Sequence, residues 1–401
     1  SENVGEVKII FCTFVCRKHF AFYHAIWYDN RRRLLHRGNR DDTMNAEEKQ
    51  GLAAALPERL LPWYREHARA LPWRRDRAPY HVWLSEIMLQ QTRVEAVRGY
   101  YSRFLETCPD IPALAACPPE VLNKLWQGLG YYTRVRNLQK AAQCICRDYG
   151  GEFPRDIAAI RELPGIGPYT AGAIASICFE QPEPAVDGNV LRVMTRFLAD
   201  ATPLERPALR REITQALATV YPAGQCGAFT QSLMELGALV CLPNGAPLCG
   251  QCPLQAICRA SAAGNPCAYP VRAPKAARRV EERTVFVFSC DGRQALEKRP
   301  PEGLLAGLWQ YPNVLGKLSV AQAIAQAEQW GVRPRQLEKS VERQHIFTHI
   351  TWRMTAYYFQ CGAAPAAFIW AAPSEIAQRF ALNMDETALY LSVLHTPHRV
   401  R

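Results

Sequence analysis

The sequence contains no uninterrupted apolar run that approaches the roughly 20 residues a helix needs to cross a bilayer, so we expect no membrane partner. It also lacks an evident secretory signal, because its first 43 residues carry Asp29, Asp41 and Asp42 and no small-residue cleavage site. These absences favour a reducing, cytoplasmic compartment. There the 15 cysteines are expected to be buried small side chains or metal ligands rather than disulfides.

An excess of acidic residues is also lacking. The 401 residues include 48 Lys and Arg against 37 Asp and Glu, which gives a formal net charge of +11. Such a balance favours polyanionic partners, although charge alone does not select nucleic acid over an acidic membrane surface. A chain of this length is expected to form two or three domains.

Composition divides the chain into four parts. Residues 1–43 show neither a helical nor an alternating period, and we interpret them as an atypical extension from a misplaced start, with Met44 as the true beginning. Residues 44–260 have a helical pattern with short breaks, which predicts a compact all-α domain. Residues 261–283 are rich in Ala, Pro, Lys and Arg, as in a linker, and this compact linker favours a bacterial origin. Residues 284–401 mix β-rich and helical segments, which predicts a separate α/β domain.

The segment LPGIGPYTAGA, residues 163–173, has the glycines of a tight turn between two helices. Gly165 and Gly167 permit positive φ angles and close backbone approach, and the helix that follows can offer its free N–H groups to an anion. An ordinary corner between two helices is the alternative. Asp187 follows Tyr169 by eighteen residues. A phosphate-binding turn beside a carboxylate favours chemistry on a nucleic acid.

Two carboxylates are candidates for that chemistry. Glu86 lies among apolar residues in WLSEIMLQQT, and an apolar environment raises the pKa of a carboxyl and keeps its proton available. The alternative is a solvated glutamate on a helix surface. Asp187 could be the N-cap of the helix that begins with VLRVMTRF, or an ionised carboxylate in the site.

Four cysteines form the pattern C-x7-C-x2-C-x5-C. Four thiolates within eighteen residues suit either a tetrahedral zinc ion or a [4Fe–4S] cluster, and the spacing alone does not decide between them. The four are Cys241, Cys249, Cys252 and Cys258.

Taken in order, the motifs LPWR, WLSEIMLQQT, GLGYYTRVRNL, LPGIGPYTAGA, PAVDGNV, the cysteine quartet and a β-rich tail resemble the adenine-specific mismatch DNA glycosylases of the helix–hairpin–helix, endonuclease III superfamily. The resemblance extends from about Met44 to the C-terminus. It implies a helix–hairpin–helix body with a C-terminal Nudix-like domain, acting as a monomer. The implied partner is double-stranded DNA that contains adenine opposite 8-oxoguanine or guanine.

The resemblance also implies roles for the candidate catalytic residues. Glu86 protonates adenine at N7 and later helps to activate water, while Asp187 stabilises the oxocarbenium ion by electrostatics or a transient covalent bond. Tyr169 and Asn189 orient this pair. Endonuclease III-type enzymes carry a lysine at the position of Tyr169, whose amine forms a Schiff base, so the tyrosine implies a glycosylase without strand cleavage. A tyrosine that merely packs at the start of a helix is the alternative.

Further residues match the DNA-contacting positions of the resembling family. Gln91 and Tyr131 match residues that insert into the duplex when the base is flipped out, and Arg74 is a candidate contact to the extruded adenine. Two ring positions in a helical core are the alternative for Tyr131 and its neighbour Tyr132. In the C-terminal domain the resemblance assigns recognition of 8-oxoguanine to a loop matched by Phe347, Thr348 and His349, with Thr348 where serine is more usual.

The resemblance implies that the cysteine quartet holds a structural [4Fe–4S] cluster, although its first spacing is one residue longer than the family's usual six. Three other functions stay open. A bifunctional pyrimidine-lesion glycosylase is disfavoured by Tyr169, and a non-catalytic, cluster-bearing DNA-binding or redox-sensing protein leaves Glu86 and Asp187 without a purpose. A Nudix hydrolase is disfavoured because residues 325–329 read AQAEQ where such enzymes carry clustered metal-binding carboxylates.

Overall fold

The computed structural model describes residues 44–274 and 277–382. The predicted extension over residues 1–43 lies outside the described residues, as do two residues of the predicted linker and the last nineteen residues of the predicted C-terminal domain. In the described residues, no helix is both long enough and apolar enough to span a membrane.

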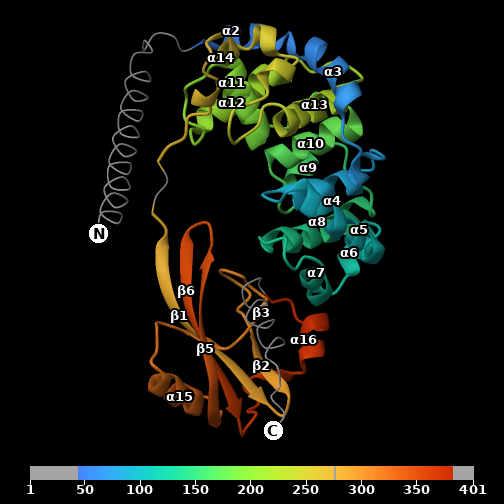
Figure 1. Cartoon of the computed structure of the whole chain (residues 1–401). Helices are drawn as coiled ribbons and strands as arrows, with labels where there is room; N and C mark the ends of the chain where they lie inside the picture. The colour runs from blue at the N-terminus through green and yellow to red at the C-terminus, as the bar shows by residue number, and fades with distance from the viewer. Residues whose placement is uncertain (1–43, 275–276, 383–401) are drawn as a thin grey trace, which may run out of the picture.

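The N-terminal part is entirely helical, as the sequence predicts, and its helices form two lobes with separate cores (Figure 1). One core is built mainly from residues between Leu71 and Ile174, and the other from residues 53–63 and 186–254. The chain therefore starts in the second lobe, crosses to the first and returns. The helices are α2 (Ala46–Ala53), α3 (Leu56–His67), α4 (Pro79–Leu89), α5 (Val94–Thr107), α6 (Ile111–Ala116), α7 (Pro119–Leu125), α8 (Thr133–Tyr149), α9 (Ile157–Glu162), α10 (Pro168–Phe179), α11 (Gly188–Leu198), α12 (Pro207–Ala218), α13 (Cys226–Leu239) and α14 (Arg259–Ala262), with short 3-10 turns η1 (Pro72–Arg74), η2 (Cys249–Gln251), η3 (Gln255–Ile257) and η4 (Pro266–Ala268).

Two breaks between helices position the site. The apolar period of residues 81–104 runs through both α4 and α5, but the chain turns at residues 90–93 between them. The second break is the hairpin of residues 163–167 between α9 and α10. There Gly165 has a φ of +77°, and a Cβ at this residue would lie only 2.6 Å from Cβ of Asn137 on α8. Glycine is therefore required at this turn by both conformation and space.

The C-terminal part is a mixed sheet in the order β3-β2-β1-β6-β5, with β4 paired to β1 and β7 to β2. Strands β1 and β6 run parallel, and β5 and β6 form an antiparallel hairpin. Successive residues of β1 face opposite sides, so Val285 and Val287 belong to one core and Phe286 and Phe288 to the other. Helix α15 contributes to the second of these cores and α16 to the first. The elements are β1 (Arg279–Cys290), β2 (Arg293–Lys298), β3 (Trp309–Gln310), β4 (Asn313–Leu315), α15 (Val320–Gln329), β5 (Pro334–Ile346), β6 (Ile350–Cys361), β7 (Ile369–Ala371) and α16 (Pro373–Arg379).

This arrangement confirms the predicted fold class, an all-α body followed by an α/β domain. The sheet domain contacts the α5–α8 lobe. Leu308 and Ala381 join the core of that lobe, and Nζ of Lys124 donates to the carbonyl of Phe380 at 3.2 Å. Nη1 of Arg136 donates to the carbonyl of Ala306 at 2.5 Å.

Candidate active site and nucleic-acid interface

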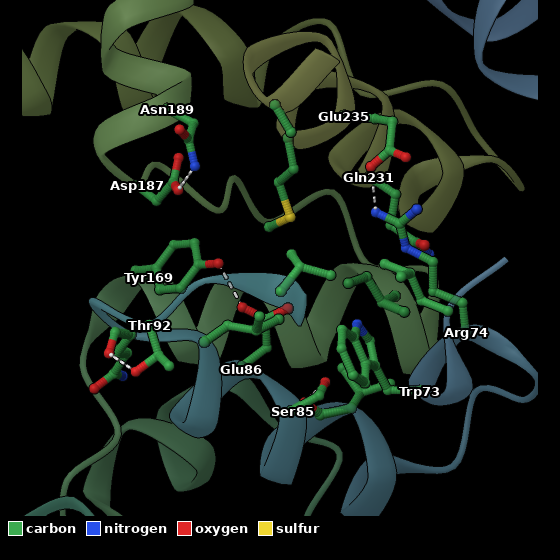
Figure 2. Close-up of a pocket in the computed structure, with 18 of the residues that line it drawn as sticks. Trp73, Arg74, Ser85, Glu86, Thr92, Tyr169, Asp187, Asn189, Gln231 and Glu235 are labelled. Carbon is green, nitrogen blue, oxygen red and sulfur yellow. Dashed lines mark hydrogen bonds and ion pairs between the residues drawn. The ribbon is translucent and has the colours of Figure 1, made fainter. Parts of the chain in front are cut away.

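A cavity of about 700 Å³ lies where the two helical lobes meet, between α4, α10, α11 and α13 (Figure 2). It is lined by most of the residues that the sequence predicts for catalysis and base recognition. These are Arg74, Glu86, Gln91, Tyr169, Asp187 and Asn189. They come from four separate segments of the chain, so the fold itself brings them together.

Glu86 lies on α4 and is only 7% exposed, which excludes the alternative of a solvated surface glutamate. Helix α4 is buried on most of its circumference, because every residue from Val82 to Met88 is buried and five of these seven are apolar. The pKa of Glu86 is raised from 4.5 to about 7, mainly by burial; the hydrogen bond from Tyr169 and the charge of Arg74 oppose the rise, and the nearby charge of Asp187 adds to it. A carboxyl with this pKa retains a proton in a substantial fraction of molecules at neutral pH.

Tyr169 lies in the first turn of α10 and its hydroxyl donates a hydrogen bond to Oε2 of Glu86 (Figure 2). Burial, followed by the charges of Glu86 and Asp187, raises the pKa of Tyr169 well above its ordinary value, so the phenol stays protonated. The tyrosine therefore orients one oxygen of the carboxyl and leaves the other toward the cavity. Its side chain does more than pack at a helix start.

Asp187 faces Glu86 across the cavity (Figure 2). One oxygen accepts the backbone N–H of Val190 at 2.7 Å, which makes Asp187 the N-cap of α11, and the other accepts Nδ2 of Asn189 at 2.8 Å. The N-cap interpretation is confirmed, and the same side chain lines the cavity, while its role as an ionised carboxylate in catalysis stays a prediction. Burial raises the pKa of Asp187, while the hydrogen bonds from Val190 and Asn189 lower it.

The cavity also contains a buried ion-pair cluster that the sequence interpretation missed. Glu235 on α13 is fully buried and accepts Nε of Arg69 at 2.7 Å and Nη2 of Arg74 at 2.8 Å. These guanidinium groups lower the pKa of Glu235 to about 2 against the effect of its burial. Gln231, one turn earlier on α13, also lines the cavity and accepts a hydrogen bond from Oη of Tyr64 at 2.8 Å. Arg74 is thus positioned by Glu235 at the wall of the cavity.

Gln91 and Tyr131, the predicted inserting residues, occupy unusual backbone conformations. Their φ angles are +59° and +49°, in the left-handed region that residues with a Cβ seldom adopt. The Tyr131 side chain is 51% exposed, which excludes a core role, whereas its neighbour Tyr132 is buried. Gln91 lies on the rim of the cavity in the turn after α4.

The predicted phosphate-binding turn is present between α9 and α10. Gly167, the N-cap of α10, does not need a positive φ, since its φ is −89°. A Cβ at Gly167 would meet no protein atom within 4 Å, so packing within the described residues does not require glycine there. Gly167 directly precedes α10, whose first N–H groups have no partner within the helix and suit an anion.

The predicted lesion-reading loop lies at the tip of the β5–β6 hairpin. Thr348 and His349 are exposed, and the Phe347 ring packs edge-on against Trp352 with centroids 4.8 Å apart. The hydroxyl of Thr348 is 2.9 Å from Oη of Tyr131, so this loop meets the predicted inserting residue of the helical body. Helix α15, at the place of the Nudix catalytic segment, carries Glu328 as its single carboxylate.

The four cysteines of the quartet line one small cavity between the end of α13 and α14. Nη1 of Arg196 lies 3.2 Å from Sγ of Cys241, which places a cation beside the thiols. Within the described ranges, no three His, Cys, Asp or Glu side chains are gathered as ligands of one metal ion. The quartet is therefore a group of thiols spaced around a cavity.

Comparison with known proteins agrees with both parts of the fold. The family model of HhH-GPD superfamily base excision DNA repair proteins matches residues 84–217, and the NUDIX domain model matches residues 284–384. Among curated relatives, the adenine DNA glycosylase of Mus musculus is 35% identical over 371 residues, covering 78% of this chain and 72% of the relative. That of Buchnera aphidicola subsp. Baizongia pistaciae is 32% identical over 296 residues, covering 73% of this chain and 82% of the relative.

Solved structures with a similar fold include a thermostable thymine-DNA glycosylase, which is 26% identical with a TM-score of 0.48, covering 54% of this chain and 98% of that chain. The sequence relatives carry the assignment, because they span both the helical body and the sheet domain. The chain is a DNA glycosylase and belongs to the adenine DNA glycosylase family of base excision repair enzymes.

Proposed function

We propose that this enzyme excises adenine opposite 8-oxoguanine, and secondarily opposite guanine, from double-stranded DNA and leaves an abasic site. The observation that carries the proposal is the pair of carboxyls in one buried cavity. Glu86 has a pKa of about 7, whereas Asp187 is held by hydrogen bonds from Val190 and Asn189. Two carboxyls in different environments take the roles of general acid and charge stabiliser.

The reaction begins when the adenine is rotated out of the duplex into the cavity. Glu86 donates its proton to N7 of the base, so that the purine leaves without full negative charge. Asp187 stabilises the positive charge that develops on the sugar, and Glu86, now a carboxylate, accepts a proton from the attacking water. Tyr169 and Asn189 keep the two carboxyls in orientation through their hydrogen bonds.

The elements that surround the cavity supply the proposed contacts to DNA. Gln91 and Tyr131 fill the space that the extruded base leaves, and Arg74 contacts the base from the cavity wall. The turn at Gly165 and Gly167 holds a backbone phosphate. In the sheet domain Phe347, Thr348 and His349 read the 8-oxoguanine on the opposite strand, and Thr348 contributes a hydroxyl as the more usual serine would. We expect the enzyme to act on DNA as a monomer.

A [4Fe–4S] cluster is the cofactor that fits the cysteine quartet. Each thiolate of such a cluster binds a different iron, whereas four thiolates of a zinc site all lie about 2.3 Å from one ion. Thiols spaced around a cavity, with Arg196 beside them, suit the former. Cys241, Cys249, Cys252 and Cys258 would hold the cluster, which supplies structural support near the DNA-binding surface and no step of base excision.

The test uses a labelled duplex with adenine opposite 8-oxoguanine, and matched duplexes with guanine or thymine opposite the adenine. Products are analysed with and without alkali. Breakage that requires alkali, fastest for 8-oxoguanine, is the expected result, because Tyr169 has no amine to open the sugar. Breakage without alkali would instead establish a bifunctional glycosylase, and DNA binding without breakage would establish a non-catalytic protein.

A further inference from the structure

Gln91 and Tyr131, the two proposed inserting residues, both have left-handed backbone, and one half-buried side chain joins their two turns. Arg134 lies in the first turn of α8, directly after the loop that carries Tyr131. Its Nη1 donates to the carbonyls of Ile87, Met88 and Gln90 at 2.6, 3.1 and 2.8 Å. Its Nη2 donates to the carbonyls of Leu129 and Gly130 at 2.9 and 3.0 Å.

Two of the five carbonyls that Arg134 binds directly precede the residues with positive φ angles. The angle φ of a residue describes rotation relative to the carbonyl carbon of the residue before it. Arg134 binds the carbonyl of Gln90, which precedes Gln91, and the carbonyl of Gly130, which precedes Tyr131. It therefore fixes the two peptide groups from which both positive φ angles are measured.

The other contacts of Arg134 show why its charged guanidinium is stable in this half-buried position. The carbonyls of Ile87 and Met88 belong to the last turn of α4, where they have no partner within the helix and where the helix dipole favours a cation. The guanidinium also lies over the Trp126 ring at 5.2 Å and the Tyr131 ring at 5.8 Å. Burial lowers the pKa of Arg134 to about 10, so its charge is retained at neutral pH.

We propose that Arg134 is a positioning residue that holds Gln91 and Tyr131 together in the left-handed conformations from which both side chains enter the DNA. This inference rests on the proposed function in that Gln91 and Tyr131 are the inserting residues. A left-handed backbone costs free energy at any residue with a Cβ, and hydrogen bonds to a charged donor offset that cost. Without them the two turns relax, and the side chains no longer project together.

The test compares Arg134→Lys with Arg147→Lys, a matched change on the exposed C-terminal turn of the same helix. Lysine keeps the charge, but its single ammonium cannot reach carbonyls of two separate segments in the fork geometry of a guanidinium. Base extraction is followed by the fluorescence of 2-aminopurine beside the target adenine, and cleavage by single-turnover rates corrected for the active fraction. We expect Arg134→Lys to slow extraction about tenfold or more, the factor associated with losing a charge-assisted hydrogen bond, and Arg147→Lys to have no effect.

Two readouts separate positioning from general support of the fold. First, the pH at which the cleavage rate is half-maximal reports the ionisation of Glu86. It should be the same in Arg134→Lys as in the wild type, because Arg134 does not contact the carboxyl of Glu86. Second, Arg134→Lys is introduced into a Gln91→Ala, Tyr131→Ala background. Since the side chains it positions are then absent, we expect no further loss of extraction there.

Each outcome has a distinct meaning. Normal extraction by Arg134→Lys, or an equal loss in both backgrounds, overturns the role of Arg134 and leaves the insertion roles intact. Normal extraction by the Gln91→Ala, Tyr131→Ala protein overturns the insertion roles themselves, and the inference with them. If Arg134→Lys does not fold, Arg134→Gln is measured in the same two backgrounds, because its shorter planar amide also cannot bridge the two segments.

Discussion

Replacing Glu86 with glutamine should slow base excision severely and, at the same time, make the protein more stable. Glutamine has nearly the same shape and can still accept the hydrogen bond from Tyr169, but it has no acidic proton. The loss of a general acid typically lowers a rate about 10²- to 10⁴-fold. We therefore expect single-turnover excision to fall within this range while DNA affinity stays essentially unchanged. In the wild type, excision should slow as the pH rises past about 7, where Glu86 loses its proton.

The stability gain follows from the pKa of Glu86, which is raised from 4.5 to about 7 in the folded protein. A raised pKa means that the folded state holds the proton more tightly than the unfolded state does. The favourable contribution is present below pH 4.5 and is lost as the pH rises toward 7. Because one pKa unit corresponds to about 1.4 kcal/mol, the shift lowers the stability of the folded state by about 3 kcal/mol at pH 8 and by about 1 kcal/mol at pH 5, relative to a side chain that cannot ionise.

The assay is denaturant unfolding of the wild type and of Glu86→Gln at pH 5 and at pH 8, followed by helical circular dichroism. The variant should be more stable at both values, and its advantage should be about 2 kcal/mol larger at pH 8. Glu58→Gln, at an exposed position of α3, serves as the control and should not reproduce this gain in stability. A gain that does not change with pH would refute the assigned ionisation, and excision at near-normal rates would refute the role of Glu86 as the acid.

Three further variants test other parts of the proposal. Asp187→Asn should abolish excision with little change in melting temperature, because asparagine also caps helices. The control is Asp156→Asn, at the N-cap of α9 and outside the cavity lining, which should keep wild-type activity. If Asp187→Asn were as active as this control, the proposed catalytic role of Asp187 would be wrong. Thr348→Ala should reduce the rate preference for adenine opposite 8-oxoguanine over guanine, and an unchanged ratio would remove this hydroxyl from lesion recognition. Cys252→Ser should lower the iron content and the visible absorption of the purified protein, whereas the control Cys144→Ser, on α8, should change neither. If the two variants contained the same amount of iron, Cys252 would not be a ligand of the cluster.

The sequence predicts those parts of the site whose signal is local. Glu86 is surrounded by apolar residues within one helical turn on each side, and Asp187 directly precedes the residues that it caps. Such features need no knowledge of the rest of the fold. The β-rich character of residues 284–401 is predicted for the same reason, because β-branched and aromatic residues gather in the segments that form β1 and β6, although β1 begins at Arg279, within the predicted linker.

Residues that line the cavity only because distant parts of the chain pack together could not be predicted from the sequence. Glu235 and Gln231 lie on α13, and they line the site only because the chain returns to pack α13 against α3 and α10. One signal for Glu235 was available, since it is a lone carboxylate in the apolar helix FTQSLMELGALV, the same pattern that marks Glu86. The two- and three-residue strands β3, β4 and β7 carried no such signal, because only their pairing with β1 and β2 defines them.

In the proposed mechanism, helix α4 connects base extraction with proton transfer. It carries Glu86 in its buried interior, and the exposed Gln91 follows two residues after its end, so the proposed acid and the proposed inserting side chain are close along the chain. A helix rises about 1.5 Å per residue, so the two positions stay within roughly 10 Å of each other in any orientation of the DNA. If Arg134 fixes the end of this helix, a base displaced by Gln91 and Tyr131 enters the cavity at a constant distance from the proton donor. Selection for an extrahelical adenine then follows from the geometry of the helix end, because a base that remains stacked cannot reach Glu86.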